Sequence, residues 1–265
     1  MENRLPAPYR RSPRPVALTD ADLELLAFLA EHRFVLSEHA AALGRVTPQT
    51  ANRRLAKLVG AGYVRREEVF SGQSPMHLIT RRGLGAVGSG LPTPRKDIHS
   101  YEHDIGVAWL WLAARRGTFG ALSEVVAERT LRSRDGAREA DSGVADGAEP
   151  LGVRLGGTGA RGREGLHYPD LLLRTADGRR VALELELTPK GRTRLEGILA
   201  GYGADPRIDG VVYLVKSQSM ARSVERAARK VGVSHLVHLQ RVRYHAAKPT
   251  AASALALERA TEAVR

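Results

Sequence analysis

Three carboxylates lie in one short stretch of the chain, HYPDLLLRTADGRRVALELELTPK, which spans residues 167–190. Asp170 precedes a run of leucines, and Glu184 and Glu186 alternate with leucines in a second apolar run. Both runs are typical of buried β-strands. Acidic side chains that meet on a half-buried sheet repel one another, so they need a cation or basic groups among them. These three residues are therefore the first candidates for chemistry.

The turn between the two runs decides which of their side chains meet. We expect strands over residues 168–174 and 180–187. Between them, Ala176-Asp177-Gly178 fits a three-residue loop with glycine in the left-handed position. This loop length pairs Leu171 with Leu183, so that the apolar faces of the two strands match.

The same register places Asp170 opposite Glu184, with Glu186 two residues further along the same face. Carboxylate oxygens are the hard ligands that Mg²⁺ and Mn²⁺ prefer. The sequence therefore predicts a metal site formed by Asp170, Glu184 and Glu186. A metal ion at this site would activate water and stabilise the charge that develops on phosphate during an in-line hydrolysis.

The residues around this hairpin predict a mixed α/β arrangement that would hold it. We expect a long helix that ends at Gly117 and then a strand, ALSEVVAERTLR, that runs through Glu128–Arg132. Residues 132–165 are rich in glycine, alanine, arginine and aspartate and show no hydrophobic period, so we interpret them as a long flexible insertion. Downstream, apolar patterns predict helix 190–203, strand 210–215, helix 218–231 and strand 235–239. The order is then α-β-β-β-α-β, in the α+β or α/β class.

The N-terminal third has a different pattern, in which short helices begin at capping residues. Thr19, Ser37 and Thr47 each precede a helical pattern, and a proline at the first helical position follows the third. The segments GYVRREEVF and MHLIT then predict a β-hairpin, and Thr80 begins a further helix. This order of elements resembles a winged helix-turn-helix domain over residues 18–88.

The third predicted helix, TPQTANRRLAKLVGAG, has apolar residues on one side and amide and guanidinium groups on the other. A recognition helix has this arrangement because its back must be seated while its front reaches base edges and phosphates. The apolar side contains Ala51, Leu55 and Leu58. The candidate DNA-binding residues are Gln49, Thr50, Asn52, Arg53, Arg54 and Lys57 on this helix, and Arg65 and Arg66 in the hairpin.

The charge balance favours a polyanionic partner. The formal net charge is +12, and 35 of the 41 basic residues are arginine, which suits phosphate neutralisation and counterion release. A GC-rich genome also inflates arginine, which is the alternative explanation. The chain has no cysteine, which excludes disulfides and thiolate metal sites. No segment has the apolar length of a signal peptide or a membrane span, so we expect a cytoplasmic, nucleoid- or plasmid-associated protein without a membrane partner.

These patterns divide the chain into two domains with flanking segments. The expected organisation is a disordered basic arm at 1–17, the winged helix at 18–88, a linker at 89–96, a nuclease-like domain at 97–243 with its insertion at 132–165, and a tail at 244–265.

The hairpin itself carries a family resemblance. A Pro-Asp pair, a strand hairpin, an E-x-E pattern and Lys190 just downstream resemble the PD-(D/E)XK nuclease superfamily. The whole chain further resembles the replication-relaxation family of actinobacterial plasmids and integrative elements. The matching pieces are His103-Asp-Ile-Gly-Val107, Glu128-Arg-Thr-Leu-Arg132, His167-Tyr-Pro-Asp170 and Glu184-Leu-Glu186. This resemblance implies participation in replication, DNA relaxation or transfer of a mobile element.

By this resemblance, the catalytic residues would be Asp170, Glu184, Glu186, Lys190 and His103. Lys190 would stabilise charge on the phosphate, and His103 or Glu102 would complete the site from the long helix. The sequence departs from the superfamily pattern, because Glu186 occupies the position where the superfamily has its lysine. The site is then an active nuclease, a fold that binds DNA without cutting it, or a structural hairpin with solvent-facing acids.

Two functions follow from these alternatives. The first is a DNA-binding protein of mobile-element replication, relaxation or transfer that nicks DNA with Mg²⁺ or Mn²⁺. The second is a non-catalytic transcriptional regulator or replication accessory factor with a degenerate nuclease fold. Both take double-stranded DNA as partner and are compatible with replication or transfer proteins and with a homodimer.

Overall fold

The structure is a computed structural model that describes residues 16–69, 71–95, 97–141, 149–158 and 164–242. The expected basic arm, apart from residues 16 and 17, and the expected C-terminal tail lie outside these ranges. The described chain is a mixed α+β structure, as the sequence predicts. Within the described ranges, no helix has both the length and the apolar content that crossing a membrane requires.

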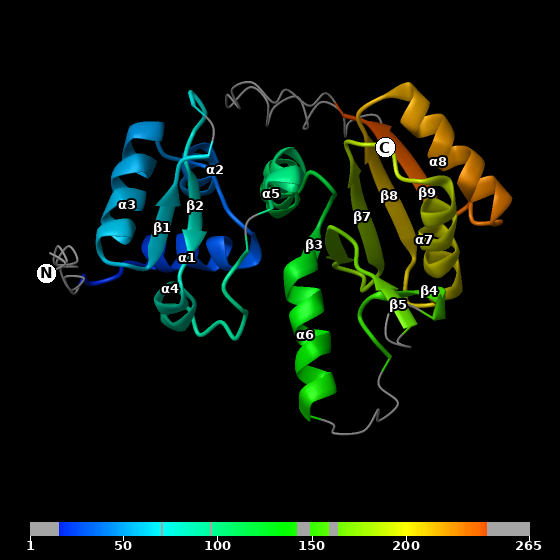
Figure 1. The fold of residues 1–265 in the computed structure, drawn as a ribbon, viewed down its shortest axis with the longest axis horizontal. Helices are drawn as coiled ribbons and strands as arrows, with labels where there is room; N and C mark the ends of the chain where they lie inside the picture. Colours follow the sequence, from blue (N-terminus) through cyan, green and yellow to red (C-terminus); the bar gives the residue numbers. More distant parts are fainter. Residues whose placement is uncertain (1–15, 70, 96, 142–148, 159–163, 243–265) are drawn as a thin grey trace, which may run out of the picture.

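The N-terminal part contains the helix, helix, helix, hairpin, helix order that the sequence predicts (Figure 1). Three of its helices begin at capping residues, since the Thr19, Thr47 and Thr80 side chains each accept a hydrogen bond from a backbone N–H three residues later. The expected cap Ser37 is instead the first residue of the second helix, which has no side-chain cap. The elements are α1 (Asp20–Glu31), α2 (Ser37–Gly44), α3 (Pro48–Gly60), β1 (Val64–Glu67), β2 (Met76–Ile79) and α4 (Arg81–Ala86).

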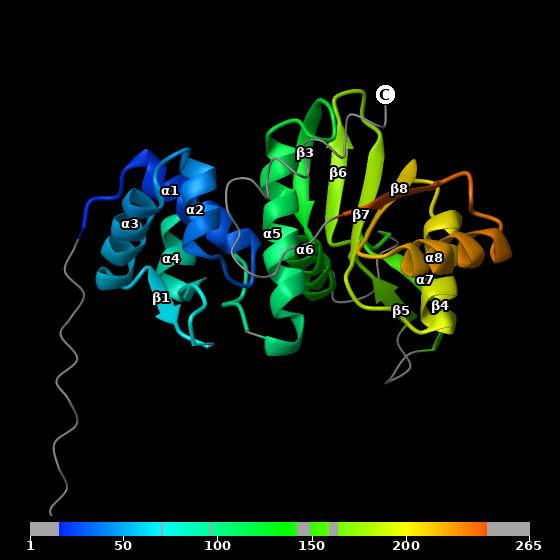
Figure 2. The ribbon, with the colours of Figure 1, turned by 90° about the horizontal axis from the view of Figure 1, so that it is seen from above.

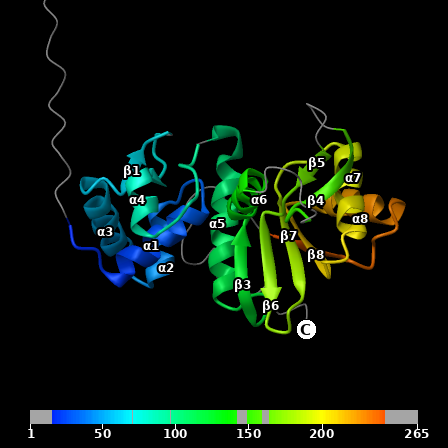
Figure 3. The same cartoon turned by 90° about the horizontal axis from the view of Figure 1, so that it is seen from below.

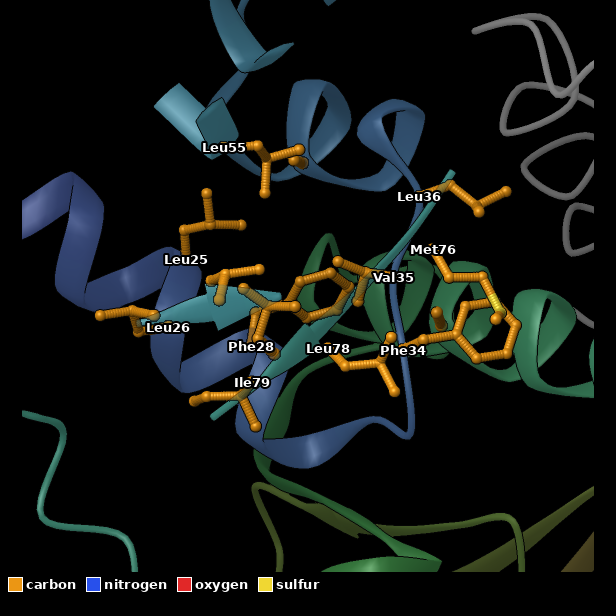
Figure 4. Packing of buried hydrophobic residues seen from close by; sticks show 14 of the residues in the cluster. Leu25, Leu26, Phe28, Phe34, Val35, Leu36, Leu55, Met76, Leu78 and Ile79 are labelled. Carbon is orange, nitrogen blue, oxygen red and sulfur yellow. The ribbon is translucent and has the colours of Figure 1, made fainter. Parts of the chain in front are cut away.

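A compact apolar core seats α3 on this N-terminal part. Leu55 of α3 is fully buried and shares one cluster with Leu25 and Phe28 of α1 and Leu78 of β2 (Figure 4). The hairpin is extended by a bridge in which Val35 pairs with His77 of β2. The back of α3 is therefore fixed, and its polar front is left exposed.

The C-terminal part is built on a five-stranded sheet of order β3-β6-β7-β8-β9. The first three strands are antiparallel neighbours, and β7, β8 and β9 are parallel. The strands are β3 (Leu122–Ala127), β6 (Leu171–Thr175), β7 (Arg180–Glu186), β8 (Gly210–Val215) and β9 (Val237–Arg241). The helices are η1 (Ile98–Ser100), α5 (Tyr101–Arg115), α6 (Glu128–Asp141), α7 (Arg192–Ala204) and α8 (Gln218–Lys230).

The sheet has a helical layer on each face. Odd-numbered residues of the central hairpin, including Leu171 and Leu183, pack with Val107 and Leu110 of α5. Even-numbered residues such as Ala182 face the other cluster, which includes α7 and α8. The period-2 alternation of strand side chains thus separates the two faces.

Helix α5 belongs to two cores at once. Ala108 and Trp109 lie in the cluster of the N-terminal part, whereas Val107 and Leu110 pack on the sheet. Figures 2 and 3 show α5 between the N-terminal helices and the sheet. The N-terminal part and the sheet therefore both pack against α5.

Two expectations for the middle of the chain are wrong. The strand that was expected to run through Glu128–Arg132 ends at Ala127, and α6 begins at Glu128. The expected insertion at 132–165 contains most of α6, the strand β4 (Val153–Thr158) and the start of its antiparallel partner β5 (Glu164–His167). Residues 142–148 and 159–163 of this insertion lie outside the described residues.

Polar tertiary contacts explain why α6 has no clear apolar stripe. Leu131 is its one buried large apolar side chain among the described residues. Four residues later on the same face, the buried Asp135 carboxylate accepts hydrogen bonds from the backbone N–H groups of Leu151 and Gly152 at 2.8–3.3 Å. A helix held in this way cannot be recognised from hydrophobic periodicity.

Candidate functional site

The β6–β7 hairpin has the register that the sequence predicts. Leu171 pairs with Leu183, and the backbone N–H of Thr175 donates to the carbonyl oxygen of Arg179 at 2.9 Å. Gly178 has φ 91°, the left-handed conformation that closes the three-residue loop. Asp170 thus precedes β6 at the same end of the sheet at which β7 finishes with Glu184 and Glu186. We refer to this end of the strands below as the edge that holds the three acids.

Asp170 connects this edge to α5. Its carboxylate accepts hydrogen bonds from the backbone N–H of Leu185 at 2.7 Å and from Nε2 of His103 at 3.2 Å. Burial alone would raise the pKa of Asp170, but His103, the Leu185 N–H and Lys190 together lower it. The aspartate is therefore held as an anion.

His103 is held as a cation by the same contact. Burial alone would lower the pKa of His103, but the carboxylates of Asp170 and Asp104 outweigh it and raise this pKa to about 10. The imidazolium consequently acts as the built-in counterion of Asp170. This contact agrees with the expectation that His103 joins the site from the long helix.

Glu184 is almost inaccessible, at 1% of its full exposure. Its Oε1 atom accepts hydrogen bonds from the Tyr202 hydroxyl of α7 at 2.5 Å and from Nε2 of His167 at 2.7 Å. Burial and the negative charge of Glu184 raise the pKa of Tyr202 well above its usual value, so the phenol remains protonated. Two side chains from different elements thus satisfy this carboxylate.

Glu186 pairs with Lys190, whose Nζ hydrogen-bonds to Oε2 of the glutamate. Burial and the nearby acids raise the pKa of Glu186 although Lys190 opposes the shift. Burial would lower the pKa of Lys190, but Glu184, Glu186 and Asp170 raise it. Lys190 is therefore the shared cation of the cluster, which we call the acid–lysine cluster and define as Asp170, Glu184, Glu186, Lys190 and His103.

The predicted metal site is not formed as a ligand group in this arrangement. Among the described residues, no group of three or more histidine or acidic side chains is placed to hold a metal ion. The carboxylates of Asp170, Glu184 and Glu186 instead bind different donors. The donor types suit Mg²⁺ or Mn²⁺, but their present geometry does not fit a shared ion.

Three residues at this end of the sheet make contacts that were not anticipated from the sequence. His167 and Tyr202 hold Glu184, and Arg33 reaches from the N-terminal part toward Asp104 at 3.8 Å and Glu128 at 3.7 Å. The polar types of His167 and Arg33 were visible, but their partners lie far along the chain. No local pattern could have assigned them.

The front of α3 is exposed, as the sequence predicts for Gln49, Thr50, Asn52 and Arg53. These amide and guanidinium groups lie on the side opposite the buried Ala51, Leu55 and Leu58. In the neighbouring hairpin, Arg65 and Arg66 are also exposed and pair with Glu67 at 3.1 Å and Glu68 at 2.7 Å. Exposed pairs of this kind are weak enough to exchange for phosphate contacts.

Two of the candidate DNA-binding residues have a different role in the structure. Lys57 Nζ lies 2.8 Å from Oδ2 of Asp22, and Arg54 Nε lies 3.7 Å from Oδ1 of the same carboxylate. Asp22 is buried, at 1% exposure. Burial would raise the pKa of Asp22, but Lys57 and the Thr19 cap lower it. Arg54 and Lys57 therefore tie α3 to α1, and the Lys57 side chain remains 39% exposed in this contact.

Comparisons with known proteins do not place the chain in a family. No family model matches the sequence, and no curated protein matches it. One similar solved structure is the crystal structure of RV1404 from Mycobacterium tuberculosis, at 20% identity and a TM-score of 0.25. The match covers 49% of this chain and 78% of that chain. A similarity at this level supports no conclusion about fold or function.

Proposed function

We propose that this protein binds double-stranded DNA through the exposed front of α3. The observation that carries the proposal is the two-sided character of this helix. Its apolar back is buried on α1 and β2, while Gln49, Asn52 and Arg53 remain exposed. Amide side chains pair with adenine and guanidinium groups with guanine in the major groove, which admits one α-helix.

The β1–β2 hairpin supports this proposal. It follows α3 directly and exposes Arg65 and Arg66, as the wing of a winged helix-turn-helix domain would. The net charge of +12 favours the same polyanionic partner. Participation in the replication, relaxation or transfer of a mobile element is the cellular role that we propose on the resemblance. A transcriptional regulator or replication accessory factor is the alternative role.

Binding of a fluorescent duplex to the purified protein tests the proposal. Loss of a base contact costs about 1–3 kcal/mol, so Arg53→Ala should weaken binding about tenfold or more. Arg179→Ala is the matched control, because it removes the same charge from an exposed arginine on the β6–β7 turn. Equal affinities for wild type and Arg53→Ala would count against α3 as the contact helix.

Metal-dependent DNA nicking is a second candidate function. The observation in its favour is the position of Lys190 beside Glu186 and near Glu184 and Asp170, which resembles the acid and lysine set of PD-(D/E)XK nucleases. Mg²⁺ or Mn²⁺ would supply water activation in such a site. Among the described residues, however, the three acids do not form a ligand group for a shared ion.

A supercoiled-plasmid assay with Mg²⁺ or Mn²⁺ separates the two possibilities for the acid–lysine cluster. Glu186→Gln and Lys190→Met are suitable variants, because neither removes the buried hydrogen bonds of Glu184. Nicking by the wild type that both variants lose would support catalysis. Plasmid binding without nicking by the wild type would assign the cluster to holding the fold.

A further inference from the structure

Helix α8 presents a stripe of arginines to solvent. Arg222, Arg226 and Arg229 are spaced by four and three residues and are all exposed. This spacing places them on one face of the helix. The opposite face is buried on the sheet and α7 through Met220, Ala221, Val224, Ala227 and Ala228. The stripe is therefore fixed in direction by the packing of its own helix.

The stripe is not neutralised within the described part of the chain. None of its three guanidinium groups forms an ion pair with a described carboxylate, whereas the neighbouring Lys230 does pair with Glu196 at 2.6 Å. The helix carries four basic residues and one acidic residue, Glu225, and so has a net charge of +3. Like charges four residues apart destabilise a helix.

The helix dipole accounts for only part of this pattern. Cations are stabilised in the last turn of a helix, which covers Arg229 and Lys230. Arg222 lies in the first half of α8, outside the last turn, so the dipole does not account for its charge. An anionic partner that lies along the stripe would compensate the repulsion between its arginines.

The position of α8 places the stripe on the same side of the sheet as Glu184. The helix follows β8, which runs parallel to β7. Lys216, in the connection from β8 to α8, donates its backbone N–H to the carbonyl oxygen of Glu186 at 3.2 Å. The helix therefore begins at the edge that holds the acid–lysine cluster. Figures 1 and 2 show α8 at the opposite end of the molecule from α3.

We propose that α8 is a second DNA-contact surface, which binds phosphates of the backbone through Arg222, Arg226 and Arg229. The exposed face of α8 has no aromatic side chain for base stacking, and its one amide is Gln218 at the start. This surface therefore holds DNA independently of its sequence, whereas the amides of α3 discriminate between bases. The inference rests on the proposed function, since it takes DNA as the polyanion.

The salt dependence of DNA binding tests the role of the stripe. Affinity of the full-length protein for a fluorescent duplex of random sequence is measured between about 50 and 200 mM salt. Each neutralised phosphate contributes about 0.9 to the slope of log affinity against log salt concentration. The variant Arg222→Ala/Arg226→Ala/Arg229→Ala should therefore lose about 2–3 of this slope. Conversion of the same three residues to lysine should retain the slope.

A second triple variant controls for net charge. Arg134, Arg174 and Arg179 are also exposed but already pair with Glu124 or Asp177. Their replacement by alanine should change the slope much less, and thermal unfolding of every variant checks that the fold persists. An unchanged slope in the α8 alanine variant, or an equal change in the control, would overturn the inference. If Arg53→Ala still weakened binding in that case, the proposed function would stand.

A wild-type protein that binds no duplex at low salt would overturn the proposed function and this inference together. The two failures are therefore distinguishable.

Discussion

Glu184 is the most buried of the three carboxylates at the sheet edge, and two side chains from different elements hydrogen-bond to it. Asp170 and Glu186 have separate cationic partners in His103 and Lys190. Repulsion among neighbouring acids is thus relieved by protein groups. At the residue scale, each acid of the cluster has a donor from the protein itself, while burial and the neighbouring acids still disfavour the charged form of Glu186.

Two buried tyrosines test this interpretation of Glu184. Tyr202 donates its hydroxyl to the carboxylate, whereas the Tyr213 hydroxyl, also buried, has no hydrogen-bond partner among the described residues. Hydrogen bonds to charged groups contribute about 1.5–3 kcal/mol, so Tyr202→Phe should lower the free energy of unfolding by that amount. Tyr213→Phe is the matched control and should be neutral or slightly stabilising. Equal losses in urea denaturation would contradict the assigned contact.

His103 should remain protonated well above neutral pH. Its pKa is raised to about 10 by Asp170 and Asp104 despite burial, from an ordinary value of 6.5. Because the folded-state pKa is the higher one, this group stabilises the fold fully below about pH 6.5 and loses its contribution as pH rises toward 10. NMR titration of the imidazole checks the pKa directly. In Asp170→Asn the transition should move toward neutral pH, and an unmoved transition would show that Asp170 is not the cause.

At the element scale, fewer polar residues of α3 are unpaired than its sequence suggests, because Arg54 and Lys57 pair with Asp22 of α1. Arg53 is exposed, whereas Lys57, one turn later, pairs with the buried Asp22 of α1. The apolar pattern correctly predicted the back of the helix. It could not predict the Asp22 contact, because Asp22 lies 35 residues away along the chain.

Alanine at position 57 should therefore lower the stability of the fold, whereas alanine at position 53 should mainly weaken DNA binding. Lys57→Ala leaves the buried Asp22 with fewer donors and should lower the free energy of unfolding by about 1–3 kcal/mol. Arg53→Ala should stay within about 0.5 kcal/mol of the wild type because it is a surface change, while it weakens DNA binding. Urea denaturation and duplex binding of both variants measure the two effects. A stability loss for Arg53→Ala larger than that for Lys57→Ala would refute this division.

The difference between local patterns and contacts distant along the chain also explains which elements the sequence could predict. Alternating leucines and the Ala176-Asp177-Gly178 loop determined the β6–β7 register, because strand period and turn length are local properties. Helix α6 was missed because buried polar groups such as Asp135 hold it. The acids of the site were visible as residue types, but their donors, His167 and Tyr202, depend on tertiary packing.

At the scale of the whole molecule, α5 joins the two parts of the chain and buries histidines against the N-terminal helices. His39 contacts Trp109 edge to face with ring centroids 4.6 Å apart, and the His32 ring centroid lies 5.9 Å from that of Trp111. Burial lowers the pKa of both His32 and His39 to about 3. Both imidazoles are therefore neutral in the folded protein.

Acid should weaken this junction. The folded-state pKa values of about 3 lie below the ordinary 6.5, so the unfolded chain binds more protons than the folded chain between these two pH values. Their contribution to stability is complete above about pH 6.5 and is lost as pH falls toward 3. Replacing His32 with phenylalanine should reduce the loss of stability between pH 7 and 5, as followed by urea denaturation. The same change at the exposed His235 should leave the acid loss unaltered, and an equal effect at both positions would contradict the argument.

The proposed DNA binding requires α3 to lie against the duplex. The most direct measurement places a photoreactive side chain at Asn52 on the front of α3, or at Asp177 on the exposed β6–β7 turn, in the full-length protein. Irradiation with a bound duplex should give cross-links from position 52 and few from position 177. Binding of the duplex with no cross-link from position 52 would contradict the central claim.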